Sequence, residues 1–76
     1  MSEDGSVLDV ARYMTRYQIG AVPVLDKTYR PGVFAEQVGI FSEQDLMTRV
    51  VAQGLDPAST KVGEVMTKRV AVLSED

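Results

Sequence analysis

The chain changes from strand to helix within the stretch Gly39-Ile40-Phe41-Ser42-Glu43-Gln44-Asp45. The β-branched and aromatic residues of Val33–Phe41 predict a strand. Ser42, followed three positions later by Asp45, is typical of a helix that begins with a capping box. The stretch therefore predicts a strand whose end leads directly into the first turn of a helix.

The segments after this stretch predict a helix, a short helix and a strand. The first helix carries an apolar stripe expected to face the core, and it ends at Gly54, a residue suited to the left-handed conformation that follows many helices. That stripe consists of Leu46, Met47, Val50 and Val51. Thr60–Met66 is interpreted as one or two helical turns, and Val70–Leu73 as a short apolar strand.

The segments before the stretch predict a helix and an edge strand. Ser6 is the expected N-cap of the helix, which ends near Tyr17–Gly20. Its apolar face consists of Val7, Val10, Ala11 and Met14. Ala21–Leu25 contains Pro23, which cannot donate to a strand ladder, so this strand is expected at an edge. Met1–Gly5 is interpreted as a polar lead-in, too short and polar to be a strand.

This order of elements predicts an α+β fold in which two helices cover one face of a small β-sheet. Asp26–Gly32 is the expected loop of the hairpin within that sheet. The other face of the sheet needs cover as well. The pattern of elements therefore predicts that the domain pairs with a partner.

The composition excludes several kinds of chemistry. The 76 residues include no Cys and no His, so disulfides, thiolate nucleophiles, imidazole bases and the usual zinc ligands are excluded. No Ser–Lys or paired-carboxylate spacing stands out. The formal charge of −3 reflects acidic chain ends, and neither a basic stripe nor an apolar run of membrane-spanning length is present. We expect a cytoplasmic, non-catalytic protein without a metal, a nucleic-acid partner or a membrane partner.

The polar residues of the strand-to-helix junction suit a ligand that carries phosphate and vicinal hydroxyls. Backbone N–H groups at a helix start favour anions, and Gly39 permits close approach to the backbone. Asp45 could accept hydrogen bonds from two ribose hydroxyls, and Arg49 on the same face could reach a phosphate. The alternative is structural: Ser42 only caps the helix, Asp45 completes the capping box, and Arg49 pairs with Asp45.

Three motifs in order resemble those of the cystathionine-β-synthase-type (CBS) domain family. The first, Gly-hydrophobic-x-Ser/Thr-x-x-Asp after a strand, is carried by Gly39, Ile40, Ser42 and Asp45. The second is the hydrophobic-Pro-Val-hydrophobic-Asp run within Ile19–Asp26. The third is the Val-x-x-hydrophobic-Met-Thr signature of Val62–Thr67. The resemblance extends from Ser6 to Leu73.

The resemblance implies a ligand and roles for individual residues. The ligand would be AMP, ADP, ATP or an adenosyl compound such as S-adenosylmethionine, bound for regulation rather than as a cofactor. Asp45 would bind the ribose hydroxyls, Ser42 would contact ribose or phosphate, and Arg49 is a candidate phosphate contact. The adenine pocket would be lined by Ala21, Val22 and Pro23, with Val22 packing on the base.

The resemblance also implies a domain organisation. Residues 6–67 would form the core of a single repeat, and residues 68–76 would correspond to the strand that begins the next repeat. The chain would then be one repeat offset by one strand. Because the family pairs its repeats, we expect a homodimer or association with a second CBS repeat. The alternative function is a dimerisation or scaffold domain without a ligand.

Overall fold

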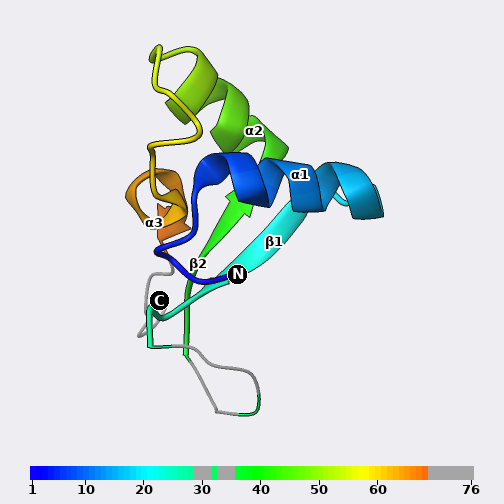
Figure 1. Cartoon of the computed structure of the whole chain (residues 1–76), viewed down its shortest axis with the longest axis vertical. Coiled ribbons are helices and arrows are strands. Elements are labelled where there is room, and N and C mark those ends of the chain that lie inside the picture. Colours follow the sequence, from blue (N-terminus) through cyan, green and yellow to red (C-terminus); the bar gives the residue numbers. More distant parts are fainter. Residues whose placement is uncertain (29–31, 33–35, 69–76) are drawn as a thin grey trace, which may run out of the picture.

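The structure, a computed structural model, describes residues 1–28, 32 and 36–68. Its elements are α1 (Val7–Tyr17), β1 (Ala21–Leu25), β2 (Gln37–Ser42), α2 (Glu43–Asp45), the π-helix η1 (Leu46–Val51), α3 (Val62–Val65) and β3 (Thr67–Lys68). Within this part of the chain the strands form one antiparallel sheet in the order β1-β2-β3 (Figure 1). The predicted α+β class is therefore confirmed.

Two of the predicted strands lie wholly or partly outside the described residues. The strand predicted over Val70–Leu73 lies outside the described residues, and so do positions 33–35 of the strand predicted over Val33–Phe41. The assignment of residues 68–76 to the next repeat therefore stays a prediction.

Helix α1 begins and ends through local hydrogen bonds. The Ser6 hydroxyl accepts from the backbone N–H of Asp9 at 3.1 Å, as its N-cap role requires. After Tyr17, it is Gln18 rather than Gly20 that takes the left-handed conformation, with φ of 54°. The strain of a non-glycine residue there is offset because the Gln18 N–H donates to the carbonyl of Thr15 at 3.3 Å.

One face of the sheet is buried beneath the helices. Val22 and Val24 of β1 and Phe41 of β2 point to this face and are almost completely buried. Side chains of α1, η1 and α3 complete the core, namely Val7, Val10, Met14, Val50, Val62 and Val65, followed by Met66. Because a fully buried Phe contributes about 1.5–3 kcal/mol, this apolar cluster is the main stabilising feature of the fold.

The lead-in before α1 takes part in strand pairing. Ser2 forms a parallel bridge with Leu25, the Glu3 N–H donates to the Leu25 carbonyl at 2.9 Å, and the Leu25 N–H donates to the Met1 carbonyl at 2.6 Å. Met1–Gly5 forms no strand, as predicted, but its backbone still makes an isolated bridge to the end of β1. Ladder hydrogen bonds use backbone groups, which every non-proline residue carries whatever its side chain.

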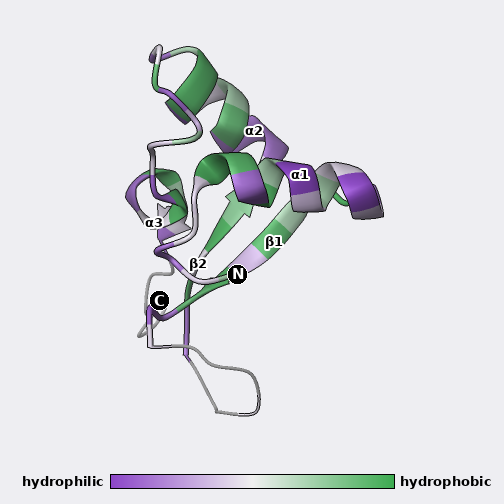
Figure 2. Ribbon diagram, viewed as in Figure 1, coloured by the Kyte–Doolittle hydropathy of each residue, from purple (hydrophilic) through white to green (hydrophobic). Residues whose placement is uncertain are grey.

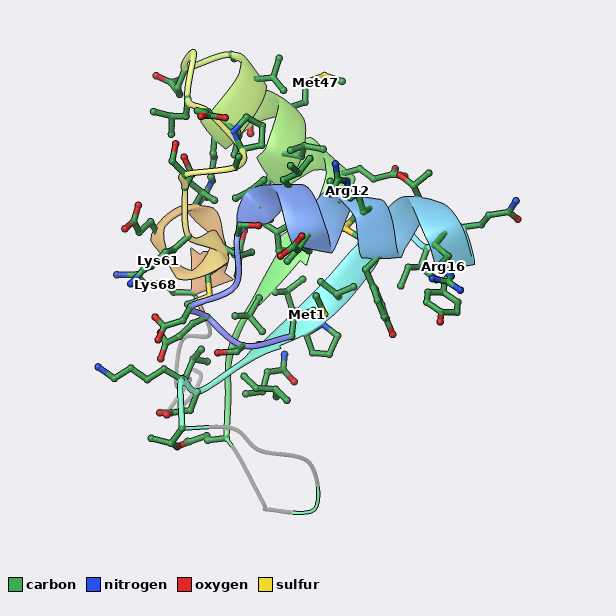
Figure 3. The ribbon with its side chains drawn as sticks, in the orientation of Figure 1. Met1, Arg12, Arg16, Met47, Lys61 and Lys68 are labelled. Atoms are coloured by element: carbon green, nitrogen blue, oxygen red, sulfur yellow. The ribbon has the colours of Figure 1, made fainter. Side chains whose placement is uncertain are left out.

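Helix η1 departs from the regular α-helix that its apolar stripe predicts. The Ala52 N–H donates to the Met47 carbonyl at 2.8 Å, an i→i+5 bond of a π-helical turn. Val50 is buried, whereas Met47 and Val51 are 67% and 63% exposed. The predicted burial of these two residues is wrong because a π turn changes the angular spacing of side chains. Figure 2 shows the hydrophobic turns of η1, and Figure 3 shows Met47 directed away from the sheet.

Candidate functional site

The sheet face opposite the helices is exposed and carries several of the predicted site residues. Antiparallel partners point to the same face, and neighbours along a strand alternate. Ala21 pairs with Ser42, Pro23 with Ile40, and Ile40 in turn with Thr67. These residues therefore form rows across β1, β2 and β3 on one face, which we call the open face.

Two shallow hollows lie on the open face. One has a volume of about 270 Å³ and is lined by Ala21, Val22, Pro23, Gln37 and Ile40. The other, of about 160 Å³, is lined by Gln37, Gly39, Ile40, Thr67 and Lys68. Because Gln37 and Ile40 line both, the hollows adjoin along β2. The open face thus offers a groove with apolar walls, whose end is bordered by Lys68, the partner of Gly39 in β3.

Two of the predicted site residues point to the covered face instead. The Val22 side chain is buried in the core, so a base on the open face would meet the side chains of Ala21 and Pro23 rather than that of Val22. A methyl group at Gly39 would lie 2.6 Å from Met66 Sδ and 2.6 Å from the Thr67 carbonyl oxygen. The atoms that lie close to the Gly39 backbone are therefore those of Met66 and Thr67 in the same chain.

Ser42 and Asp45 form a reciprocal capping box at the start of α2. The Ser42 hydroxyl accepts from the Asp45 N–H at 3.2 Å and donates to Asp45 Oδ2 at 3.1 Å. The Ser42 N–H donates to the same carboxylate oxygen at 3.0 Å. The predicted capping box of Ser42 and Asp45 is confirmed by these bonds. They satisfy helix N–H groups that have no partner within the helix.

The Asp45 carboxylate also binds two side chains outside the capping box. The Thr67 hydroxyl lies 3.1 Å from Oδ1 and 3.3 Å from Oδ2, and Arg49 Nε lies 3.5 Å from Oδ1. Arg49 Nη1 donates to the Met66 carbonyl at 3.0 Å. This bond links η1 to the residue before β3. Asp45 itself is only 6% exposed. Ion pairing of Arg49 with Asp45, predicted as an alternative, is confirmed.

Thr67 is the residue at this junction that the sequence interpretation missed as a site residue. It belongs to the Val62–Thr67 signature, which indicated a repeat boundary but no contact. It lies 22 residues from Asp45, so no local pattern connects the two. Its place opposite Ile40 brings the Thr67 hydroxyl to the carboxylate and to the edge of the open-face groove.

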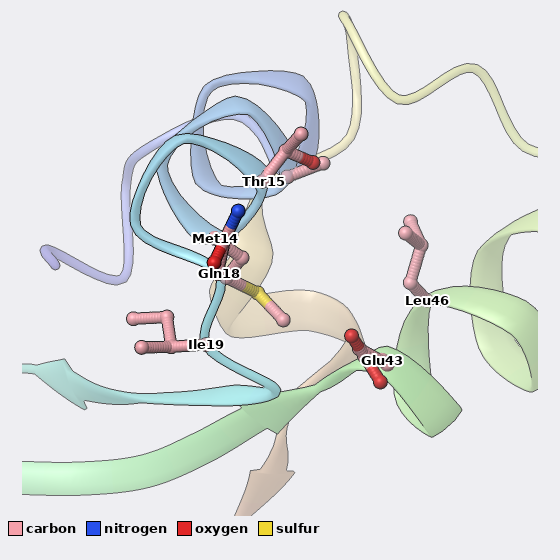
Figure 4. Close-up of a pocket in the computed structure, with 7 residues that line it drawn as sticks. Met14, Thr15, Gln18, Ile19, Glu43 and Leu46 are labelled. Carbon is pink, nitrogen blue, oxygen red and sulfur yellow. The ribbon is translucent and has the colours of Figure 1, made fainter.

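A third hollow, of about 320 Å³, lies between the end of α1 and the start of α2 (Figure 4). Its lining consists of Ala11, Met14, Thr15, Gln18, Ile19, Glu43 and Leu46. None of the residues predicted to bind a ligand is among them. The open face is therefore the better candidate site.

The described residues contain few features that would suggest other chemistry. No group of three His, Cys, Asp or Glu side chains within them is placed to hold a metal ion. In that same part of the chain, no helix has the length and apolar character needed to cross a bilayer. Lys61 and Lys68 lie on the same side of the molecule (Figure 3), and Lys61 Nζ is 3.6 Å from a carboxylate oxygen of Asp4.

Solved structures share this fold. A crystal structure of a cystathionine beta-synthase domain protein fused to a Zn-ribbon-like domain superposes with a TM-score of 0.77 at 29% identity, covering 96% of this chain and 94% of that one. The CBS domain protein PAE2072 from Pyrobaculum aerophilum, complexed with AMP, has a TM-score of 0.73 at 22% identity and covers 100% of this chain and 53% of that one. The shared architecture is that of a CBS repeat.

Sequence comparison assigns the family. The family model described as the CBS domain matches residues 1–52, so this chain belongs to the CBS domain family. The CBS domain-containing protein CBSX3, a mitochondrial protein of Arabidopsis thaliana, is 35% identical over 65 residues, which are 86% of this chain. The chain spans 30% of the length of that relative.

Proposed function

We propose that this chain is one repeat of a non-catalytic regulatory module that binds an adenine nucleotide or adenosyl compound between paired repeats. One observation carries the proposal: Ala21, Pro23 and Ser42 share the open face, beside a groove whose lining residue Thr67 hydrogen-bonds to Asp45. These are residues of the CBS motifs, in a chain of that family. The AMP bound to the Pyrobaculum aerophilum protein supports the class of ligand.

Pairing follows from the shallowness of the groove. Sites for small molecules usually bury about 70–90% of the ligand. Both hollows are open toward solvent, so a nucleotide lying in them would keep one side in water. A second CBS repeat or a second copy of this chain, set against the open face, would enclose the ligand and also cover the exposed Ile40.

Residues in and beside the groove offer suitable contacts to the base, the ribose and the phosphate of a nucleotide. Ala21, Pro23 and Ile40 offer apolar contact to a base, and the Ser42 hydroxyl can hydrogen-bond to ribose or phosphate. Lys68 borders the adjoining hollow at the sheet edge, and its flexible side chain can bring a positive charge toward phosphate. Arg49, whose side chain is 49% exposed, is a second candidate for that role.

The test is calorimetric titration of AMP, ADP, ATP and S-adenosylmethionine into the wild-type chain and into Asp45→Asn. We expect binding to the wild type and at least about tenfold weaker binding to the variant, because Asn lacks the charge that strengthens hydrogen bonds from ribose hydroxyls. Asp9→Asn is the matched control, since Asp9 occupies the same position after the N-cap of α1, away from the groove. If none of the four compounds binds the wild type, nucleotide binding is wrong.

A dimerisation or scaffold domain without a ligand is the second candidate function. It is favoured by the Asp45 carboxylate, which is buried and already accepts hydrogen bonds from three donors of Ser42 and Thr67. A dimer whose stability and mass do not change with any of the four compounds would select this function. The cytoplasmic location and the lack of nucleic-acid and membrane partners stay predictions, and the Arabidopsis relative is a mitochondrial protein.

A further inference from the structure

The Asp45 carboxylate already accepts hydrogen bonds from three donors of the chain, and the Arg49 guanidinium faces its remaining side at 3.5 Å. Two carboxylate oxygens offer roughly four lone-pair sites. Oδ2 accepts from the N–H and the hydroxyl of Ser42, while the Thr67 hydroxyl lies within 3.3 Å of both oxygens and Arg49 lies near Oδ1. With 6% exposure, the carboxylate also has almost no contact with water. A ligand hydroxyl can therefore reach Asp45 only by displacing one of these partners.

Thr67 is the partner that a ligand would displace. The Ser42 bonds lie within one helical turn and hold the helix start, so their loss would disturb α2. Arg49 is also anchored on the Met66 carbonyl and carries a charge that the buried carboxylate needs. The Thr67 hydroxyl is neutral, is shared between both oxygens, and comes from an exposed residue that lines the open-face groove.

We infer that Thr67 is a further residue of the nucleotide site and that its hydroxyl competes with the ribose hydroxyls for Asp45. The inference rests on the proposed function. In the free chain, Thr67 satisfies the carboxylate and holds β3 against α2; when ligand binds, ribose hydroxyls take its place. Within the described residues, β3 pairs with β2 through Thr67 and Lys68, so loss of this bond loosens the start of β3. Ligand binding at Asp45 is thereby transmitted to the start of β3.

The variant Thr67→Val tests the competition, since valine keeps the shape of threonine and cannot donate. We expect Thr67→Val to bind AMP about tenfold more tightly than the wild type, equivalent to about 1.4 kcal/mol. Thr67→Ser, which keeps the hydroxyl, should bind as the wild type does. Thr48→Val is the matched control, because the Thr48 hydroxyl donates to the Gln44 carbonyl on an exposed helix surface. The gain should shrink with 2′-deoxy-AMP, which lacks one competing hydroxyl.

A second measurement uses the wild-type chain alone, so that it holds even if Thr67→Val does not fold. Amide hydrogen exchange of Thr67 and Lys68 should become faster when AMP is added at saturation. Slower or unchanged exchange would overturn the inference.

The outcomes separate this inference from the proposed function. If the wild type binds AMP and Thr67→Val binds equally or less well, competition is wrong and the proposed function stands. If both bind AMP and Thr67→Val binds it more tightly than the wild type does, competition is supported. If neither binds AMP or any of the other three compounds, the proposed function fails, and this inference fails with it.

Discussion

At the scale of single residues, Gly39 shows how closely the strands and the repeat signature are packed together. It pairs with Val24 on one side and Lys68 on the other, and the space above it is filled by Met66. One of the two tightest neighbours, both at 2.6 Å, is a backbone atom, the Thr67 carbonyl oxygen, which cannot turn away as a side chain can. Glycine at this motif position is therefore required for packing within the chain, whether or not a ligand binds.

We expect Gly39→Ala to lower the free energy of unfolding by about 1–3 kcal/mol, the usual cost of overpacking a well-filled site. Urea denaturation measures this change. The control is Gly20→Ala, where the added methyl would meet only the flexible Glu43 side chain at 3.6 Å. Equal stability of the wild type and Gly39→Ala would contradict the packing described for β3.

At the scale of elements, the turn that follows β1 is held by a carboxylate. Asp26 Oδ1 accepts from both the N–H and the hydroxyl of Thr28, each at 2.8 Å. These hydrogen bonds lower the pKa of Asp26 below its ordinary value of 3.8, and the bond from the backbone N–H of Thr28 has the largest effect. At pH values above the ordinary pKa, the lowered pKa of Asp26 stabilises the folded turn. This stabilisation is lost as the pH falls through the pKa that Asp26 has in the folded chain.

We expect Thr28→Ala to raise the pKa of Asp26 part of the way toward its ordinary value, since the variant loses the hydroxyl but keeps the backbone bond. An NMR titration of the Asp26 carboxyl carbon in acid measures the pKa directly. Thr48→Ala, on a different element, serves as the control and should leave this pKa unchanged. An Asp26 pKa that is the same in the wild type and Thr28→Ala would rule out a contribution from the hydroxyl.

At the scale of the whole molecule, the exposed aliphatic side chains of the described residues include those of two separate surfaces. Ile40, 46% exposed, lies on the open face, whereas Met47 and Val51 lie on the outer surface of η1. A domain of this size has a small core, so covering either surface would add stability. The groove makes the open face the surface that we expect to pair.

We expect the wild type to be a dimer at high micromolar concentration and Ile40→Glu to be a folded monomer, because the variant places a charge in the paired surface. Size-exclusion chromatography with light scattering measures the mass. Met47→Glu is the matched control and should remain dimeric. Dissociation by Met47→Glu but not by Ile40→Glu would move the interface to η1, and a monomeric wild type would contradict self-pairing.

Much of this fold is encoded by neighbouring residues. Ser6 and Ser42 each bond to a residue three positions on, and such bonds can be predicted because a single helical turn brings the partners together. The Val-rich run with Pro23 and the junction motif likewise predicted strands and family. The sequence by itself thus determined the helix starts, the α+β class and the membership of the CBS family.

Other features were decided only by the tertiary structure. The bond between Thr67 and Asp45 spans 22 residues, and the pairing of Ser2 with Leu25 joins segments separated by a whole helix. The outward position of Met47 depends on a π turn that hydrophobic spacing does not predict. Each of these contacts requires the chain to close a loop before its partners meet. Their geometry therefore depends on how all the elements pack, and no local pattern of residues specifies it.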